Sequence, residues 1–100
     1  MAGRGGGFCL TPRAEADLED IFAYTAQRWS ITQAEDYHAG LVAGLERLGR
    51  GERSGRPVDI PGGYLKYAVG SHLVFYRETE ADILIVRILH PRMDVERHLE

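Results

Sequence analysis

Apolar residues recur at helical spacing in the first half of the chain. The stripe of the first predicted helix consists of Leu18, Ile21, Phe22 and Trp29. Thr11, just ahead of this stripe, is a suitable N-cap, and Pro12 fits the first helical position. We therefore expect a helix over residues 12–29.

A second helical stripe follows after a short break. Its members are Ala34, Tyr37, Leu41, Leu45 and Leu48. Thr32 and Glu35 stand at the spacing of a capping box, in which each side chain bonds the backbone amide of the other residue. Gly49 lies where a C-terminal cap belongs, so we expect a helix over residues 33–48. The short link between the two helices predicts an antiparallel hairpin.

Two glycines lie inside the second predicted helix. Gly40 and Gly44 are four residues apart and share one side of it, and each costs about 1 kcal/mol relative to alanine. Close approach of the first helix, which offers Ala23 and Ala26, would offset this cost. Close approach of a partner protein is the alternative.

The rest of the chain predicts strands and one long loop. Phe8–Leu10 is a short apolar strand, and residues 49–63 form a loop with five glycines and two prolines. Three strand-like runs follow with short turns between them, which predicts an antiparallel meander: Tyr64–Val69, His72–Arg77 and Ile83–Leu89. The predicted fold is α+β in two layers: an N-terminal strand, an antiparallel helix hairpin, then a three-stranded antiparallel meander. We expect residues 1–7 to be a flexible tail, residues 8–100 to form one domain, and a short helical turn to end the chain.

The two faces of the meander can be assigned if the Glu78–Asp82 turn is symmetric, with Arg77 opposite Ile83. The face under the helices would then carry Val74, Tyr76, Leu84, Val86 and Ile88. The other face would carry Leu73, Phe75, Arg77, Ile83, Ile85 and Arg87. An exposed apolar face with two arginines is typical of a site for another molecule.

Composition and charge narrow the classes of function. The net charge of −3 argues against a protein whose main activity is to grip nucleic acid. The charge is uneven: residues 14–38 hold six acids and one base, and residues 47–77 hold six bases and two acids, which indicates two different surfaces. No apolar run reaches the ~20 residues that cross a bilayer, and no signal peptide is evident, so we expect a cytoplasmic protein without membrane contact. The single cysteine, Cys9, fits a reducing compartment.

No catalytic or metal-binding motif is evident. The serines lack nucleophile-elbow surroundings, the Gly-rich loop lacks a phosphate-binding ending, and the four histidines lack zinc spacing. We therefore expect no cofactor and no metal. His90, near Arg87 and Arg92 at the end of a strand, could act as a general acid or base in a ribonuclease, or could serve a structural role.

Three segments resemble the RelE/ParE toxin superfamily, and its ParE branch in particular. Leu10–Ile21 is similar to the family's first strand and helix, Val69–Arg77 to its central hairpin, and Ile88–Asp94 to its last strand and exit. The resemblance covers residues 8–99. It implies the toxin of a type II toxin–antitoxin system, bound by a ParD-like antitoxin whose disordered C-terminal segment folds on it. Operator DNA would be reached only through that antitoxin.

The two branches of the superfamily differ in activity. ParE-type toxins poison DNA gyrase, whereas RelE-type toxins cut messenger RNA on the ribosome with a basic cluster and a tyrosine near the C-terminus. This chain is net acidic and has no tyrosine after Met93, so the resemblance favours a non-catalytic gyrase inhibitor, and an endonuclease is the alternative. The candidate residues for binding the antitoxin or the target are Lys66, Leu73, Phe75, Arg77, Arg87, His90 and Arg92. We also expect the antitoxin to cover the basic loop at residues 47–56.

Overall fold

The computed structural model describes residues 7–93 and 98–99. Residues 1–6 of the predicted N-terminal tail, and residues 94–97 of the predicted terminal helical turn, lie outside the described part. The elements, in chain order, are β1 (Phe8–Leu10), α1 (Pro12–Arg28), α2 (Ile31–Gly49), β2 (Arg56–Pro57), β3 (Leu65–Val69), β4 (His72–Glu78) and β5 (Ile83–Leu89).

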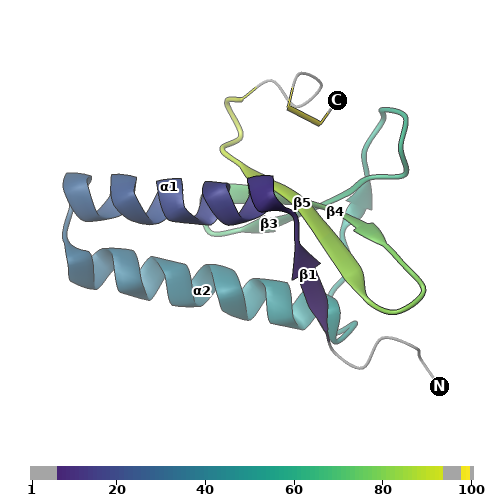
Figure 1. Cartoon of the computed structure of the whole chain (residues 1–100), viewed down its shortest axis with the longest axis horizontal. Coiled ribbons are helices and arrows are strands. Elements are labelled where there is room, and N and C mark those ends of the chain that lie inside the picture. The colour runs from purple at the N-terminus through teal and green to yellow at the C-terminus, as the bar shows by residue number, and fades with distance from the viewer. Residues whose placement is uncertain (1–6, 94–97, 100) are drawn as a thin grey trace.

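The strands form one five-stranded sheet in the order β1-β5-β4-β3-β2. β1 runs parallel to β5, and the other neighbours are antiparallel. The antiparallel hairpin of α1 and α2 packs on one side of the sheet and extends well beyond its end (Figure 1). The predicted α+β architecture in two layers is therefore confirmed. The sequence did not predict β2, which lies within the long loop and pairs with β3.

Thr11 joins the sheet to the first helix. Its side chain accepts a hydrogen bond from the Ala14 amide at 3.0 Å and donates one to the Val86 carbonyl at 2.9 Å. The helix begins at Pro12, as predicted. One residue thus caps α1 and fixes its start against β5.

The predicted start of α2 is wrong by two residues and its predicted end by one. The N-cap is Ser30, whose extended backbone lets its side chain accept from the Gln33 amide at 3.0 Å, so Thr32 lies inside the helix and no capping box forms. At the other end, Gly49 is buried within the helix and Arg50 is the C-cap. The left-handed backbone falls on Gly51, with φ of +77°.

The contact that requires a glycine at position 44 comes from β3 rather than from α1. A Cβ at this position would lie 2.8 Å from a methyl group of Val69, so the helix can pack this closely on the strand only without a side chain. A Cβ at Gly40 would meet nothing within 4 Å. The predicted contact with Ala23 and Ala26 is therefore not the reason for either glycine.

The register between β4 and β5 differs from the symmetric turn that we predicted. Glu78 pairs with Ile83 and Arg77 with Leu84, and a bulge shifts the register between Phe75 and Tyr76. These two shifts turn Ile83 and Ile85 toward the helices and leave Leu84 and Val86 off that face. The predicted positions of Val74, Tyr76 and Ile88 under the helices are confirmed. Because the side-chain period of a strand is two, a one-residue shift reverses its faces.

The far face of the sheet has a small core of its own. Phe75, Leu89 and Leu99 are buried there, and residues of the 58–64 loop pack against them. The Tyr64 hydroxyl donates a hydrogen bond to the Leu99 carbonyl at 3.2 Å. This face is therefore largely covered by the chain itself, and the prediction of an exposed apolar surface there is wrong.

In the described part of the chain, neither helix has the length and apolar character that a bilayer crossing requires.

Candidate binding surfaces

A basic surface lies on β2, β3 and β4, on the face of the sheet away from the helices. Its members are Arg56, Lys66 and Arg77, all exposed. Arg56 pairs directly with Lys66 across β2 and β3, an arrangement of like charges that destabilises a sheet. The guanidinium of Arg77 lies 5.6 Å from the ring centroid of Tyr64, which orients it by a cation–π contact. These three exposed cations form a surface suited to an anionic partner.

Arg87 does not belong to this surface. It is only 8% exposed, and its Nε and Nη2 donate to the two carboxylate oxygens of Asp17 at 2.8 and 2.9 Å. The hydrogen bond to Asp17 raises the pKa of Arg87, desolvation opposes the shift, and the charge of Asp17 adds to it. The same carboxylate accepts from the Ile88 amide at 2.9 Å, at the edge of β5 beyond the end of β1. Asp17 therefore closes this edge of the sheet.

The remaining predicted site residues lie in different environments. Phe75 is fully buried and Leu73 is half-buried in the far-face core, so neither presents an apolar surface. His90 and Arg92 are exposed beyond β5, where His90 Nδ1 accepts from the Arg92 amide at 3.2 Å. Among the predicted residues, the structure thus brings together Lys66 and Arg77 as exposed residues of the sheet, and His90 and Arg92 as exposed residues after β5.

A hollow of about 640 Å³ lies between the overhanging part of the helix hairpin and the end of the sheet. Its lining consists of Tyr24, Thr25, Trp29, Gln33, Asp36, Tyr37, Ser71, His72 and His90. Trp29 was expected in the buried stripe of the first helix, but it caps α1 and is 63% exposed. Trp29 is exposed because it follows the last turn of α1, where the helix extends past the sheet.

Three polar contacts organise the floor of the hollow. The Tyr37 hydroxyl accepts from the Ser71 amide at 2.8 Å and lies 2.6 Å from His72 Nδ1. The rings of His72 and His90 meet edge to face, with 5.8 Å between their centroids. The Tyr37 proton can then bond His72 Nδ1 only if that nitrogen is unprotonated. Burial, and next the charge of His90, lower the pKa of His72, while Asp17 opposes the shift.

We predict that stability falls as the pH drops below the ordinary His72 value of 6.5. The pKa of His72 is lower in the folded protein than in the unfolded chain, so the unfolded chain binds this proton first as the pH falls. The contribution of neutral His72 to the free energy of unfolding is therefore fully present above pH 6.5 and is lost as the pH falls through the lower folded pKa. Urea unfolding between about pH 5 and about pH 7.5 measures how steeply the free energy of unfolding changes with pH. His72→Gln should flatten this slope, and an identical slope in the variant would contradict the prediction.

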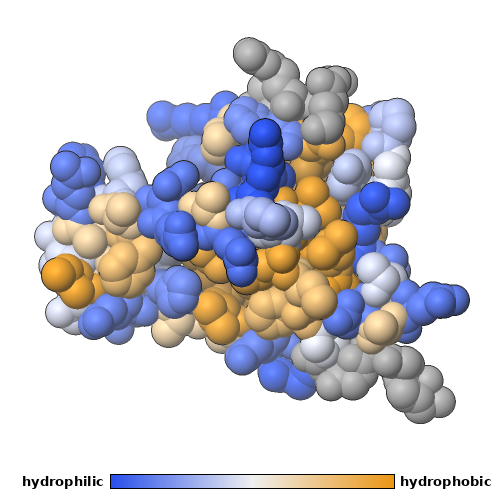
Figure 2. Space-filling view, viewed as in Figure 1, coloured by the Kyte–Doolittle hydropathy of each residue, from blue (hydrophilic) through white to orange (hydrophobic). Residues whose placement is uncertain are grey.

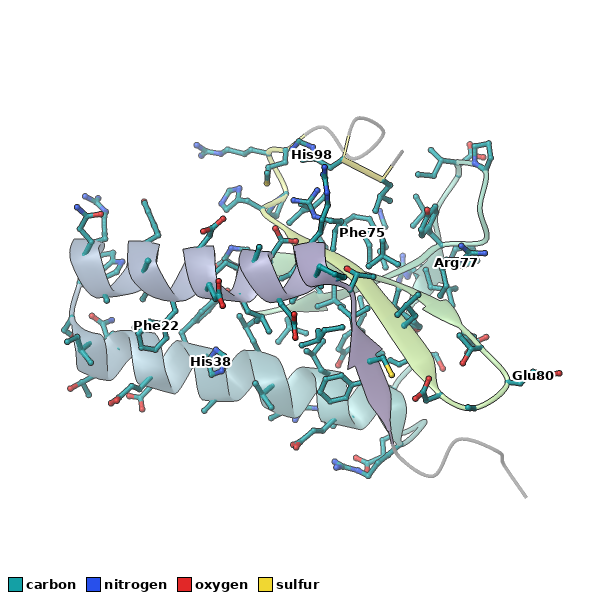
Figure 3. The ribbon with its side chains drawn as sticks, in the orientation of Figure 1. Phe22, His38, Phe75, Arg77, Glu80 and His98 are labelled. Carbon is teal, nitrogen blue, oxygen red and sulfur yellow. The ribbon has the colours of Figure 1, made fainter. Side chains whose placement is uncertain are left out.

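A narrow groove lies on the outer side of the hairpin. Phe22 from α1 and His38 from α2 point toward each other there, with ring centroids 6.0 Å apart (Figure 3). His38 Nδ1 is buried and has no hydrogen-bond partner among residues 7–93 and 98–99. Figure 2 shows hydrophobic residues gathered where the helices meet β1, with hydrophilic residues along the outer sides of the helices. This groove is apolar but small.

Comparison with known proteins gives the family. Residues 9–95 match the family described as the ParE toxin of the type II toxin–antitoxin system parDE. Toxin ParE1 of Mycobacterium tuberculosis is 46% identical over 94 residues, covering 92% of this chain and 96% of that protein. Toxin ParE1 of Caulobacter vibrioides is 42% identical over 91 residues, covering 90% and 94%.

The chain belongs to the ParE toxin family. A solved structure from the chromosomal ParDE toxin–antitoxin system of P. aeruginosa has the same fold, with a TM-score of 0.74 over 84% of this chain and 94% of that one, at 22% identity. The family resemblance seen in the sequence is thereby confirmed. Within the described residues, no three His, Cys, Asp or Glu side chains lie close enough to hold a metal ion.

Proposed function

We propose that this ParE-family toxin inhibits DNA gyrase by binding it, acts in the cytoplasm, and is neutralised by a ParD-like antitoxin. The observation that carries the proposal is the match to ParE toxins over residues 9–95. The exposed cations of the basic surface are consistent with a toxin that acts by binding.

The alternative of a ribosome-dependent endonuclease rests on Arg77, Arg87 and His90 acting at one phosphate. In the structure each has a different neighbour: Arg77 stacks on Tyr64, Arg87 is held by Asp17, and His90 meets His72. A buried arginine bound to a carboxylate cannot also stabilise a scissile phosphate without breaking that pair. This arrangement favours the binding toxin over the endonuclease.

The antitoxin is proposed to place acidic side chains on the basic surface. Arg56 and Lys66 are opposite each other and have no ion-pair partner among the described residues, so an acidic segment would relieve their repulsion. Arg50 differs from them because Glu52 already holds its Nε at 2.6 Å. The proposed contact is therefore concentrated on β2, β3 and β4 rather than on the whole loop at 47–56.

Purified toxin added to a gyrase supercoiling reaction tests the target. We expect a relaxed plasmid to stay relaxed and linear DNA to appear after denaturation, because the toxin would hold gyrase with DNA cleaved. The control is toxin bound beforehand to its cognate antitoxin, which should restore supercoiling. Unchanged supercoiling and cleavage would overturn the proposal. Loss of intact messenger RNA in a translation reaction would instead support the endonuclease.

A further inference from the structure

The hollow under the helix hairpin has the chemistry of a cation site. Aromatic rings of Tyr24, Trp29 and Tyr37 line it, and Tyr24 is 64% exposed and so is free to contact a ligand. The face of an aromatic ring attracts a cation, most strongly in tryptophan. Three such rings around one hollow form the kind of cage that surrounds ammonium and guanidinium groups.

One carboxylate lines the hollow together with the aromatic rings. Asp36 is the single lining residue, among those described, that carries a formal charge at neutral pH. No hydrogen bond or ion pair ties its side chain elsewhere in the described part of the chain. Trp29 already shows the attraction, because the guanidinium of its neighbour Arg28 lies 5.5 Å from the ring centroid.

The histidines on the floor favour the same ligand. The Tyr37 hydroxyl can donate to His72 Nδ1 when that nitrogen is unprotonated, and His90 Nδ1 accepts from the Arg92 amide. Burial lowers the pKa of His72, which keeps it uncharged near neutral pH. Within the described part of the chain, Asp36 is therefore the one formally charged residue that lines the hollow, and the Arg28 guanidinium lies 5.5 Å from the centroid of the Trp29 ring.

We infer that this hollow binds an arginine side chain carried by a segment of a protein partner. The planar guanidinium can stack on an aromatic ring while its N–H groups reach the Asp36 carboxylate. The volume of about 640 Å³ holds such a side chain together with neighbouring residues of the segment. This surface is opposite in sign to the basic surface, so one toxin can engage two partner segments of opposite charge at once.

The only tryptophan of the chain, Trp29, reports directly on the site. Its fluorescence can be followed while the full chain is titrated with the peptide acetyl-Gly-Arg-Gly-amide, up to about 50 mM because a single side chain binds weakly. The matched peptide with citrulline has the same shape without the charge. We expect a saturable change with arginine and none with citrulline.

Substitution of the carboxylate gives the second arm. Asp36→Asn should weaken binding of the arginine peptide by about tenfold, whereas Glu35→Gln, the same charge change on a neighbouring exposed acid outside the hollow, should leave it unchanged. Tyr24→Leu should also weaken binding, because it removes one ring. Equal effects of the Asp36 and Glu35 variants would overturn the inference.

Lowering the pH gives a third arm. The groups that face His72 are Tyr37 and Asp36 from α2, His90 after β5, and Asp17 of α1 at longer range. Protonation of the His72 imidazole would place positive charge beside the ligand, so binding should weaken as the pH falls below the ordinary His72 pKa of 6.5.

Other occupants give distinguishable results. A response to a glutamate peptide but not to arginine would assign an acidic segment, and a change with protein concentration alone would assign a second copy of the chain; either result overturns the inference. Because the peptide is measured on the toxin alone, the outcome does not depend on whether gyrase is the target.

Discussion

Asp17→Ala should lower the free energy of unfolding by about 3–5 kcal/mol, the range for removing one partner of a buried ion pair. Arg87 is 8% exposed and would remain charged without its carboxylate, and the Ile88 amide would lose its acceptor. For a domain whose total stability is roughly 5–15 kcal/mol, this is a large part. Urea unfolding followed by circular dichroism measures the loss.

The matched control is Asp20→Ala, because Asp20 is an exposed residue of the same type on the same helix. Its loss should be within about 0.5 kcal/mol of the parent. A double variant, Asp17→Leu with Arg87→Met, should recover most of the stability, because an apolar pair of similar volume needs no charge compensation. Equal losses in Asp17→Ala and Asp20→Ala would show that the pair contributes nothing.

The architecture followed from local patterns in the sequence. The cap at Thr11, the apolar stripes and the short turn between β3 and β4 each depend on residues close in sequence, and their elements appear within about two residues of the predicted bounds. The register of β5 was not predictable in this way. It depends on a turn that is one residue shorter than assumed and on a bulge opposite Phe75 and Tyr76, and neither has a strong composition signal.

The burial of Arg87 was the main error in the candidate site, and a signal for it was present. An arginine within the apolar run Ile83–Leu89 needs a carboxylate if the strand is buried. Asp17 stands three residues after Ala14 and four before Ile21, on the side of the helix that faces the sheet. A residue 70 positions away could be paired with Arg87 only through the fold, because helix phase gives a face but not its partner.

Two surfaces of the molecule have opposite character for a structural reason. The basic surface lies on β2, β3 and β4, on the face of the sheet away from the helices, and the hollow is lined by residues of the helix hairpin and of the turn between β3 and β4. The hairpin extends past the sheet (Figure 1). The charge asymmetry of the sequence, acidic in residues 14–38 and basic in residues 47–77, is thus converted into two separated surfaces. A partner that wraps the toxin could use both, which is consistent with an antitoxin segment of mixed charge.

Arg77→Glu should weaken the complex with the cognate antitoxin by about 3 kcal/mol, or more than about a hundredfold in Kd, if Arg77 meets a carboxylate in the interface. Arg77 is exposed in the free toxin and oriented by Tyr64, so the side chain is already placed to receive a partner. Reversal of its charge removes that contact and adds repulsion. Calorimetric titration of antitoxin into toxin measures the change.

Arg13→Glu is the control for Arg77→Glu, because Arg13 is an exposed arginine at the start of α1, away from the basic surface. It changes the net charge by the same amount, so any general electrostatic attraction between toxin and antitoxin falls equally in both variants. A loss of affinity confined to Arg77→Glu would assign a specific contact on the sheet. Equal affinities in both variants would remove Arg77 from the interface and leave the antitoxin to bind elsewhere, with the hollow under the hairpin as the next surface to test.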